Sequence, residues 1–417
     1  MVSACTIDLR RFHGGRAPVM LLGGLNLVRA LGLARIPAIV ASPEGDNPAL
    51  ASRFATARYE LPPLDNRHAV VEALVRAGER LAAEFGGAVP LLYGDDDWLA
   101  LVQDFRDALA PCYRFALNDP DVAAALIDKE RFAALGRSRD LPLPRALQWS
   151  ELEGFPGPVL VKPKSKIAWH DSPIHRRLFG GAGKARVFQS GRELSAHPLA
   201  LQLQRDLMLQ EYVPGGDREL WSFHGFADEK GAALAWFIGR KLRTYPALTG
   251  MSSYLELAHD GALAALGRQI AARIPLKGVF KMDFKRDAAG GRWVLLEINA
   301  RFNLWHHVAA RNGVNLPQVA YDYLQHGIRR SCPAMPARHR STWRWLCLRL
   351  DYRAFRELAS RGELTWAGWL WSIARPPKVY DLFSWSDPLP FLHHWLARLK
   401  RIPRLTLRLW RWLSTAS

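Results

Sequence analysis

The chain has 417 residues, and a usual domain size of about 150 residues predicts two or three domains. Apolar residues make up 49% of it, enough for a packed core, which excludes a wholly disordered protein. A net charge of +18 indicates a polyanionic partner, such as nucleic acid, a membrane surface or a phosphorylated ligand.

The positive charge is unevenly distributed along the chain. From Ser331 onward there are 15 Lys and Arg against 5 Asp and Glu, a net charge of +10, and 9 of the 16 tryptophans. The first 330 residues carry the remaining +8. The charge excess is therefore mainly a property of a C-terminal segment rich in Trp and Arg.

The cysteines have no metal-ligand spacing, which argues against zinc and a disulfide scaffold: they are Cys5, Cys112, Cys332 and Cys347. Asp8 and Arg10 interrupt any secretory pattern near the N-terminus. The most apolar stretch, 17–41, contains Arg29 and Arg35, so we expect no membrane-spanning helix. These features favour a cytoplasmic protein.

The first block alternates strand and helix signals. Apolar runs at 18–24, 36–41 and 89–93 read as buried strands, and 70–85 reads as an amphipathic helix. This rhythm predicts a parallel sheet covered by helices. Gly23-Gly24 reads as a tight turn, because no G-x-G-x-x-G follows. Asp95 to Asp97 could bind a cation, but we prefer the interpretation that one of them caps the next helix.

Phosphate-contact signals lie in the middle of the chain. We expect a helix over 119–134 that contains Lys129, and a boundary in the Pro- and Gly-rich stretch 142–158. Lys162 stands on a strand, 159–163, ahead of a loop whose Gly181, Gly183 and Lys184 suit an anion. Further strands are expected at 187–188, 207–213 and 232–238. The last residues of the second of these, Glu211, Tyr212 and Val213, could offer backbone groups to a purine, and Glu219 could accept ribose hydroxyls.

The most informative stretch is an alternating pair of arms, 278–284 and 293–301, separated by a turn at 289–291, which predicts a β-hairpin. Glu297 and Asn299 are two residues apart and share a face, which Asp283 on the partner strand can also reach. Two carboxylates and an amide oxygen suit Mg²⁺. The alternative is an ordinary solvated hairpin face.

The ordered set of these motifs resembles the ATP-grasp superfamily. The set comprises Lys129, the Val-Lys-Pro of 161–163, the Gly-rich loop, 210–217, the Gly-Arg-Lys-Leu-Arg-Thr-Tyr-Pro of 239–246, Asp283, and the Glu-Ile-Asn-Ala-Arg of 297–301. Within the superfamily, the chain is similar to the carboxylate–amine ligase branch, which includes carbamoyl-phosphate-synthase-like and D-aspartate-ligase-like proteins. The resemblance covers roughly residues 15–330.

The resemblance implies an α/β (α+β) architecture in three parts. These are a Rossmann-like pre-ATP-grasp domain over 1–115, an ATP-grasp domain over 116–330 with a lid at about 145–213, and a helical basic extension over 331–417. It also implies ATP, one or two Mg²⁺ (with Mn²⁺ as a substitute), and ligation of a small carboxylate to an amine through an acyl phosphate. The alternatives are a kinase of the same fold and a non-catalytic, membrane-associated nucleotide-binding protein.

The resemblance assigns a role to each candidate residue. Phosphates would be contacted by Lys129, Lys162 and the loop with Gly181, Gly183 and Lys184. Adenine would lie against Glu211, Tyr212 and Val213, and the ribose against Glu219. Metal would be held by Asp283, Glu297 and Asn299. The transferred phosphoryl group or the acceptor carboxylate would meet Arg301, Arg240, Lys241, Arg243 and Lys281.

Two segments depart from the family pattern. The stretch 164–179 is long and separates Lys162 from the Gly-rich loop that would cover the phosphates. His306 and His307 follow the Arg301 motif and could line a substrate pocket, although histidines on a helix are more often structural.

The C-terminal tail carries an apolar stripe. Leu392, Trp395, Leu396 and Leu399 have helical spacing, and the stripe continues over 402–412 beyond a kink at Pro403. A basic helix with Trp and Leu on one face is typical of binding to an anionic membrane surface. The alternative is a cap packed on the core. No nucleic-acid module is recognisable, and a homodimer is left open.

Overall fold

The computed structural model describes residues 7–12, 15–164, 177–179, 185–248, 250–329 and 342–398. The chain folds into two compact units, each described separately below. Unit 1 combines Met1–Ala116, Arg301–Arg330 and Val379–Ser417, and unit 2 combines Leu117–Ala300 and Ser331–Lys378. The first boundary lies next to the predicted one at 115. The described part of the predicted extension 331–417 is divided between the units, because 342–378 groups with unit 2 and 379–398 groups with unit 1.

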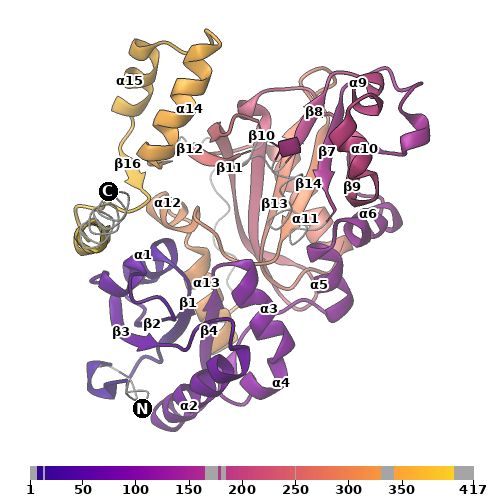
Figure 1. Ribbon diagram of the computed structural model, residues 1–417. Coiled ribbons are helices and arrows are strands. Elements are labelled where there is room, and N and C mark those ends of the chain that lie inside the picture. The colour runs from indigo at the N-terminus through magenta and orange to yellow at the C-terminus, as the bar shows by residue number, and fades with distance from the viewer. Residues whose placement is uncertain are drawn as a thin grey trace, which may run out of the picture. The chain divides into compact units, whose positions relative to one another are not determined.

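Unit 1 contains a five-stranded parallel sheet in the order β3-β2-β1-β4-β5 (Figure 1). Its strands are β1 (Val19–Leu22), β2 (Ala38–Ser42), β3 (Ala55–Glu60), β4 (Val89–Tyr93) and β5 (Tyr113–Arg114). Its helices are α1 (Leu25–Leu33), α2 (Arg67–Phe85), α3 (Asp96–Asp104), α4 (Arg106–Leu109), α12 (His306–Arg311), α13 (Leu316–His326) and the helical stretch 389–398. All residues of β1, β2 and β4 are buried, as expected for strands of a parallel sheet covered by helices. The predicted β-α-β rhythm is confirmed.

The glycines and aspartates after β1 and β4 have structural roles. A Cβ added to Gly94 would lie 3.2 Å from the Cα of Gly23, so the two turns need glycine for their close approach. The Asp95 carboxylate accepts a hydrogen bond from the Trp98 backbone N–H at 2.9 Å, which caps α3. The preferred interpretations of both motifs, a tight turn and a helix cap, are confirmed.

Unit 2 is built on a mainly antiparallel sheet in the order β14-β13-β10-β11-β12-β15-β16. Its strands are β10 (Leu220–Ala227), β11 (Ala233–Tyr245), β12 (Met251–Ala258), β13 (Gly278–Arg286), β14 (Trp293–Asn299), β15 (Arg344–Leu346) and β16 (Lys378–Tyr380), the last at the chain's return to unit 1. The associated helices are α5 (Pro120–Ile127), α6 (Lys129–Ser138), α11 (Gly261–Arg273), α14 (Leu348–Ser360) and α15 (Trp366–Ala374). Phe223, Phe280 and Ile270 belong to the core between this sheet and α11.

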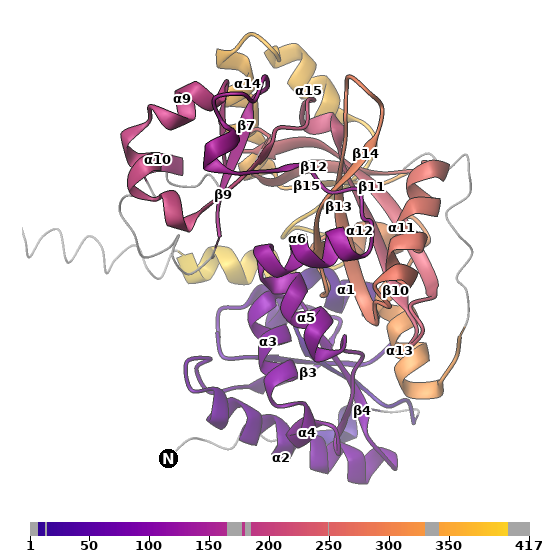
Figure 2. The same ribbon diagram turned by 90° about the vertical axis from the view of Figure 1, so that its right-hand side faces the viewer.

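A second sheet of unit 2 has its own core. It comprises β6 (Ala146–Leu147), β7 (Val159–Pro163), β8 (Arg186–Phe188) and β9 (Leu207–Glu211) in the order β6-β9-β7-β8. Two short helices, α9 (Gly191–Ser195) and α10 (Pro198–Gln202), lie beside β7 and β9 (Figure 2). Val161, Phe188, Leu194 and Leu209 are buried together. This subdomain spans the range expected for a lid.

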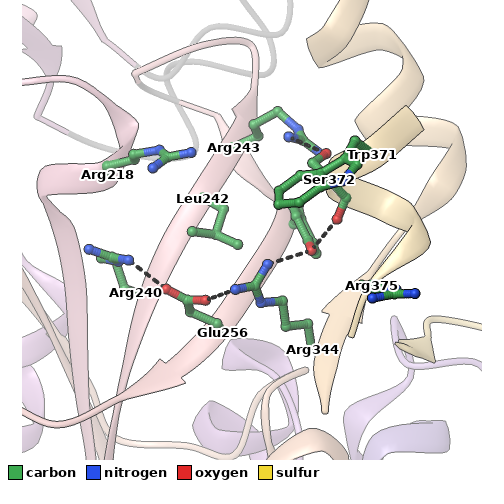
Figure 3. Close-up of a pocket in the computed structure, with 10 residues that line it drawn as sticks. Arg218, Arg240, Leu242, Arg243, Glu256, Arg344, Trp371, Ser372 and Arg375 are labelled. Carbon is green, nitrogen blue, oxygen red and sulfur yellow. Dashed lines mark hydrogen bonds and ion pairs between the residues drawn. The ribbon is translucent and has the colours of Figure 1, made fainter. Parts of the chain in front are cut away.

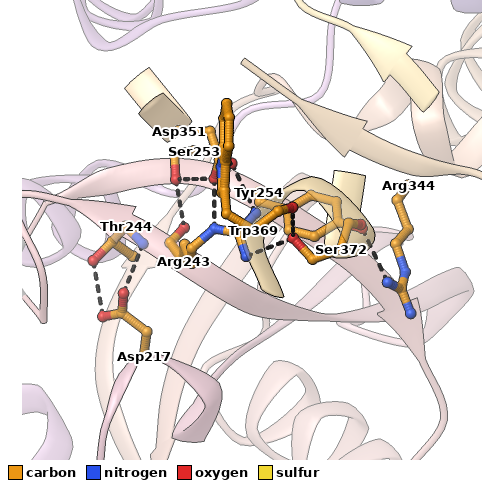
Figure 4. A network of polar contacts seen from close by, with 9 residues as sticks. All are labelled: Asp217, Arg243, Thr244, Ser253, Tyr254, Arg344, Asp351, Trp369 and Ser372. Carbon is orange, nitrogen blue, oxygen red and sulfur yellow. Dashed lines mark hydrogen bonds and ion pairs between the residues drawn. The ribbon is translucent and has the colours of Figure 1, made fainter. Parts of the chain in front are cut away.

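Helices α14 and α15 are tied to the large sheet by buried polar contacts (Figure 4). Arg243 of β11 donates from Nε and Nη2 to the two carboxylate oxygens of Asp351, at 2.8 and 2.7 Å. Asp351 also accepts from the Ser253 hydroxyl at 3.0 Å and from the Trp369 indole N–H at 2.8 Å. All four side chains are buried. The described beginning of the Trp-rich segment is thus packed against the core.

The described end of the chain is anchored in unit 1. Asp387 and Arg29 are both almost completely buried, and Arg29 Nε lies 2.9 Å from Asp387 Oδ2. Beyond this anchor the helical stretch 389–398 leaves Leu392, Trp395 and Leu396 about half exposed. The rest of the predicted stripe, 399–412, lies outside the described residues. No helix in the described part of the chain combines the length and apolarity needed to span a bilayer.

His306 and His307 begin α12 and are buried. Burial lowers the pKa of His306 to about 3, and burial together with the charges of Arg29 and Arg311 lowers the pKa of His307 to about 3. Their burial fits a structural role in unit 1, and a place for them in a substrate pocket stays a prediction.

These histidines predict acid sensitivity. The folded-state pKa of about 3 lies below the ordinary 6.5, so the unfolded chain binds more protons between these values. The stability contributed by each neutral histidine is complete above pH 6.5 and is lost as the pH falls toward 3. From pH 6.5 to 5 we expect a loss of about 1.5 kcal/mol per histidine. Urea unfolding at several pH values measures this slope.

His307→Gln should make the free energy of unfolding depend less steeply on pH. His68→Gln, at an exposed position of α2, is the control and should leave this dependence unchanged. An unchanged slope in His307→Gln would contradict the assignment.

Candidate active site

The predicted hairpin is present and sets the geometry of the site. Strands β13 and β14 pair antiparallel, with Asp283 opposite Glu297 and Lys281 opposite Asn299. Directly opposed residues of an antiparallel pair share a face of the sheet. The three predicted metal-binding side chains and Lys281 therefore lie together on one face of unit 2.

Asp283 is the best-defined member of the group. Its side chain is buried and accepts hydrogen bonds from the Ser222 hydroxyl at 2.5 Å and the Lys281 ammonium at 2.6 Å. Burial alone would raise the pKa of Asp283, but the charges of Lys281 and Lys241 and these two hydrogen bonds together hold it well below its usual range. The carboxylate is therefore ionised throughout the physiological pH range.

Two half-buried lysines face the same carboxylates. Burial lowers the pKa of Lys241, on β11, and the negative charges of Asp283 and Glu297 oppose that shift. Burial also lowers the pKa of Lys162, on β7, against the charge of Glu297. The structure thus gathers three lysines and two carboxylates from four strands, although these residues are up to 135 positions apart in the chain.

The nucleotide-side candidates lie where β9 leads into β10. Tyr212 follows β9, and the Lys285 ammonium lies 4.3 Å from the centre of its ring. Burial lowers the pKa of Lys285 to about 8, while Asp217, Glu219 and Asp287 oppose the shift. Glu219 ends the 3-10 turn η5 (Asp217–Glu219). Tyr212 and Glu219 therefore both lie near the Lys285 ammonium.

Several candidates already have partners. The Glu211 carboxylate accepts from the Arg145 backbone N–H at 3.1 Å and from Arg292 Nη2 at 2.8 Å. Its neighbour Val213 is buried, and the Tyr212 backbone N–H donates to the Pro158 carbonyl. Lys129, the first residue of α6, donates to the carbonyl of Pro163 at the end of β7.

Lys285 and Ser222 were missed by the sequence analysis. Lys285 follows Lys281 and Asp283 at alternate positions of one strand, so strand alternation could have identified it. Ser222 carries no such signal, because its place opposite Asp283 depends on the pairing of β10 with β13. Gly181, Gly183 and Lys184 lie outside the described residues.

Arg240 and Arg243 do not lie with the cluster around Asp283 and Glu297. Arg240 and Lys241 are consecutive residues of one strand and therefore point to opposite faces. Arg240 Nη2 instead lies 2.6 Å from Glu256 Oε1 on the other face. The prediction that Arg240 faces the phosphates beside Lys241 is wrong for this reason. Arg243 is likewise committed to Asp351.

Arg301 begins the middle segment of unit 1. There its Nε lies 2.6 Å and its Nη2 3.3 Å from the two carboxylate oxygens of Asp96, a forked ion pair. This partner was not expected. The role of Arg301 in phosphoryl transfer stays a prediction.

The donor set fits a divalent cation that shares its coordination with a substrate. The Asn299 amide nitrogen donates to Glu297 Oε1 at 3.2 Å, which leaves the amide oxygen as a further hard ligand beside the two carboxylates. Within the described ranges, no group of three or more His, Cys, Asp or Glu side chains is placed to hold a metal. The remaining ligands would thus come from water and phosphate, as is usual for Mg²⁺.

Comparisons with known proteins agree with this architecture. A family model described as "ATP-grasp in the biosynthetic pathway with Ter operon" matches residues 204–345, a segment that includes the whole hairpin. D-aspartate ligase of Enterococcus faecium (strain Aus0004) is 21% identical over 271 residues, which are 61% of this chain and 63% of that protein. The matched region thus spans less than two thirds of that ligase.

Solved structures share the fold at low sequence identity. A biotin carboxylase from Campylobacter jejuni, solved as a complex with β-γ-ATP, has a TM-score of 0.54 and 14% identity, covering 73% of this chain and 70% of that one. An L-amino acid ligase from Bacillus licheniformis has a TM-score of 0.51 and 12% identity, covering 74% and 73%.

The parallel α/β unit, the small four-stranded sheet and the large sheet with its hairpin thus form a fold similar to that of these solved structures. Residues 204–345 match an ATP-grasp family model, and both this match and the fold agree with the resemblance that the motifs indicate.

Proposed function

We propose that the protein is an ATP-dependent ligase that activates a small carboxylate as an acyl phosphate and joins it to an amine. The observation that carries this proposal is the cluster of Asp283 and Glu297 with Lys162, Lys241 and Lys281. Charges of both signs on one rigid sheet suit a reaction in which phosphate charge must be neutralised and reactants positioned.

The chemistry needs a phosphoryl donor because a carboxylate is a poor electrophile. In the first step the γ-phosphorus–oxygen bond of ATP breaks and a carboxylate oxygen–phosphorus bond forms, which gives ADP and the acyl phosphate. In the second step the amine nitrogen attacks the acyl carbon, the carbon–oxygen bond breaks, and phosphate and a proton leave. No protein nucleophile is required.

The residues divide this work by charge. Asp283, Glu297 and Asn299 would hold Mg²⁺, which supplies neutralisation of phosphate charge when bound. Lys162 and Lys241 would contact phosphate oxygens, where an approaching polyanion favours their protonated form. Tyr212, Val213, Lys285 and Glu219 would surround the nucleoside. We retain Lys129 as a phosphate contact and Arg301 as a contact of the transferred group.

The direct test is release of ADP and phosphate by the purified full chain with ATP and Mg²⁺. A ligase releases both only when a carboxylate and an amine are present together. The screen should start with D-aspartate and other amino acids, since relatives are named D-aspartate ligase and L-amino acid ligase, and then include dipeptides and cell-envelope precursors. Amine-independent ADP release with a stable phosphorylated product would indicate a kinase instead. No release with any pair would contradict the ligase.

We also propose that the helical stretch 389–398 contacts an anionic membrane surface. Half-exposed Leu392, Trp395 and Leu396 support this, together with the basic residues that follow in the sequence. In sedimentation with vesicles that contain phosphatidylserine, Trp395→Ser/Leu396→Ser should reduce the bound fraction several-fold. Val70→Ala, a change in the core, serves as a control for altered stability. Equal sedimentation of wild type and double variant would exclude this contact.

A further inference from the structure

A second concave site lies in unit 2 (Figure 3). Arg240, which points to the sheet face opposite Lys241, is one of its lining residues. The pocket encloses about 240 Å³ between η5, β11, β12, β15 and α15. Five arginines line it, of which Arg240 and Arg344 lie across β12 from each other. No residue of the Asp283 cluster belongs to its lining.

One carboxylate lies among these arginines. Glu256 is buried, and its two oxygens lie 2.6 Å from Arg240 Nη2 and 2.6 Å from Arg344 Nη2. Arg243, which also lines the pocket, is already neutralised by Asp351. Glu256 can therefore balance only one of the two guanidinium charges that it bridges.

Two further lining arginines add uncompensated charge. Arg218 of η5 and Arg375 after α15 are exposed, and neither forms an ion pair with any residue in the described ranges. The pocket thus carries four arginines against one carboxylate, an excess of three positive charges. Burial and the charges of Arg344 and Arg243 together lower the pKa of the nearby Lys378 to about 8, which reflects the positive potential here.

The inner arginines are held in fixed orientations. The Arg240 guanidinium lies 5.3 Å from the centre of the Trp221 ring, and that of Arg344 lies 5.7 Å from the Tyr254 ring. The Tyr254 hydroxyl accepts a further hydrogen bond from Arg344 Nη1 at 2.9 Å. Solvated surface arginines lack such restraints, so the arrangement is preorganised for a ligand.

We propose that this pocket is a binding site for the phosphate group of a small ligand. A phosphate monoester carries about −1.5 to −2 charges and three acceptor oxygens, whereas a carboxylate carries one charge and two oxygens. Of these two groups, phosphate better matches an excess of three guanidinium charges around one small cavity. Trp371, 79% exposed at the edge of the pocket, offers an apolar wall to the remainder of the ligand.

The test is calorimetric titration of the full chain with inorganic pyrophosphate, in the presence of saturating Mg·ADP to occupy the nucleotide site. Arg218→Gln/Arg375→Gln should weaken binding at least tenfold, because hydrogen bonds to charged groups contribute about 1.5–3 kcal/mol each. Both positions are exposed, so the variant should retain the fold. Arg268→Gln, at an exposed position of α11 outside the pocket, removes a matched charge and should leave binding unchanged.

Glu256→Gln provides a test of opposite sign. Removal of the pocket's carboxylate should strengthen pyrophosphate binding several-fold, and added NaCl should weaken binding in every variant. Wild-type binding that equals that of the double variant would overturn the proposal, as would absence of binding to every probe.

A lipid headgroup could supply the same phosphate. Vesicles of phosphatidylcholine with phosphatidic acid form the second arm, carried out in the Trp395→Ser/Leu396→Ser background. The phosphate would be assigned to a lipid if Arg218→Gln/Arg375→Gln loses vesicle binding while the protein without these changes binds no pyrophosphate. Loss of pyrophosphate binding would assign it to a soluble ligand. Neither readout requires ligase activity, so failure here is distinguishable from failure of the proposed reaction.

Discussion

Asp387→Asn is expected to lower the free energy of unfolding by about 3–5 kcal/mol, because it leaves the Arg29 guanidinium buried without a counter-charge. Arg29 is 1% exposed and Asp387 is fully buried. Asp387 also accepts from the Ser52 hydroxyl and the Arg53 backbone N–H, both at 2.8 Å. The asparagine amide cannot accept at both of its atoms, so at least one of these donors also loses its partner.

Urea unfolding followed by far-ultraviolet circular dichroism measures this loss. Asp65→Asn, at an exposed position of the same unit, should change stability by no more than about 0.5 kcal/mol. Arg29→Met/Asp387→Leu should recover much of the loss, because it removes both buried charges. A wild-type unfolding curve for Asp387→Asn would show that the ion pair is not needed for stability.

Glu297→Gln should reduce turnover of the proposed ligase reaction at least about 100-fold and raise the Mg²⁺ concentration needed for half-maximal rate. Glu297 faces Asp283 directly across the hairpin, and the amide keeps its size while removing its charge. The loss would therefore report on charge at the proposed metal site. The measurement is ADP release under saturating substrates as Mg²⁺ is varied.

Glu153→Gln is the matched control, since Glu153 is an exposed carboxylate of the same unit. It should retain wild-type turnover. Circular dichroism should show that both variants are folded. Full activity of Glu297→Gln at low Mg²⁺ would remove Glu297 from the metal site and leave the hairpin face as ordinary solvated surface.

The hairpin was predictable because its signal is local. Alternating residues and a glycine turn specify the pairing, and the pairing places Asp283 opposite Glu297. The same alternation predicts that Arg240 and Lys241 point to opposite sides of the sheet. The prediction that Arg240 faces the phosphates was wrong because the two residues were treated as one basic patch. By contrast, the sequence carries no signal for the Arg301–Asp96 pair, whose members are 205 positions apart.

The C-terminal segment shows a similar limit. Its Trp content indicated burial or membrane contact equally well, because both remove apolar surface from water. Trp369 is buried against Asp351, whereas Trp385 is 89% exposed. Only the pairing of distant segments decides which tryptophan belongs to the core.

The distance in sequence between Arg29 and Asp387 bears on the order in which the protein acquires its structure during synthesis. The two residues are 358 positions apart, so a ribosome must translate almost the whole chain before the counter-charge of Arg29 exists. Domains usually fold from the N-terminus as they emerge. Here the first unit to emerge is among the last that can be completed, and the nascent chain must keep an unpaired arginine hydrated until its final segments arrive.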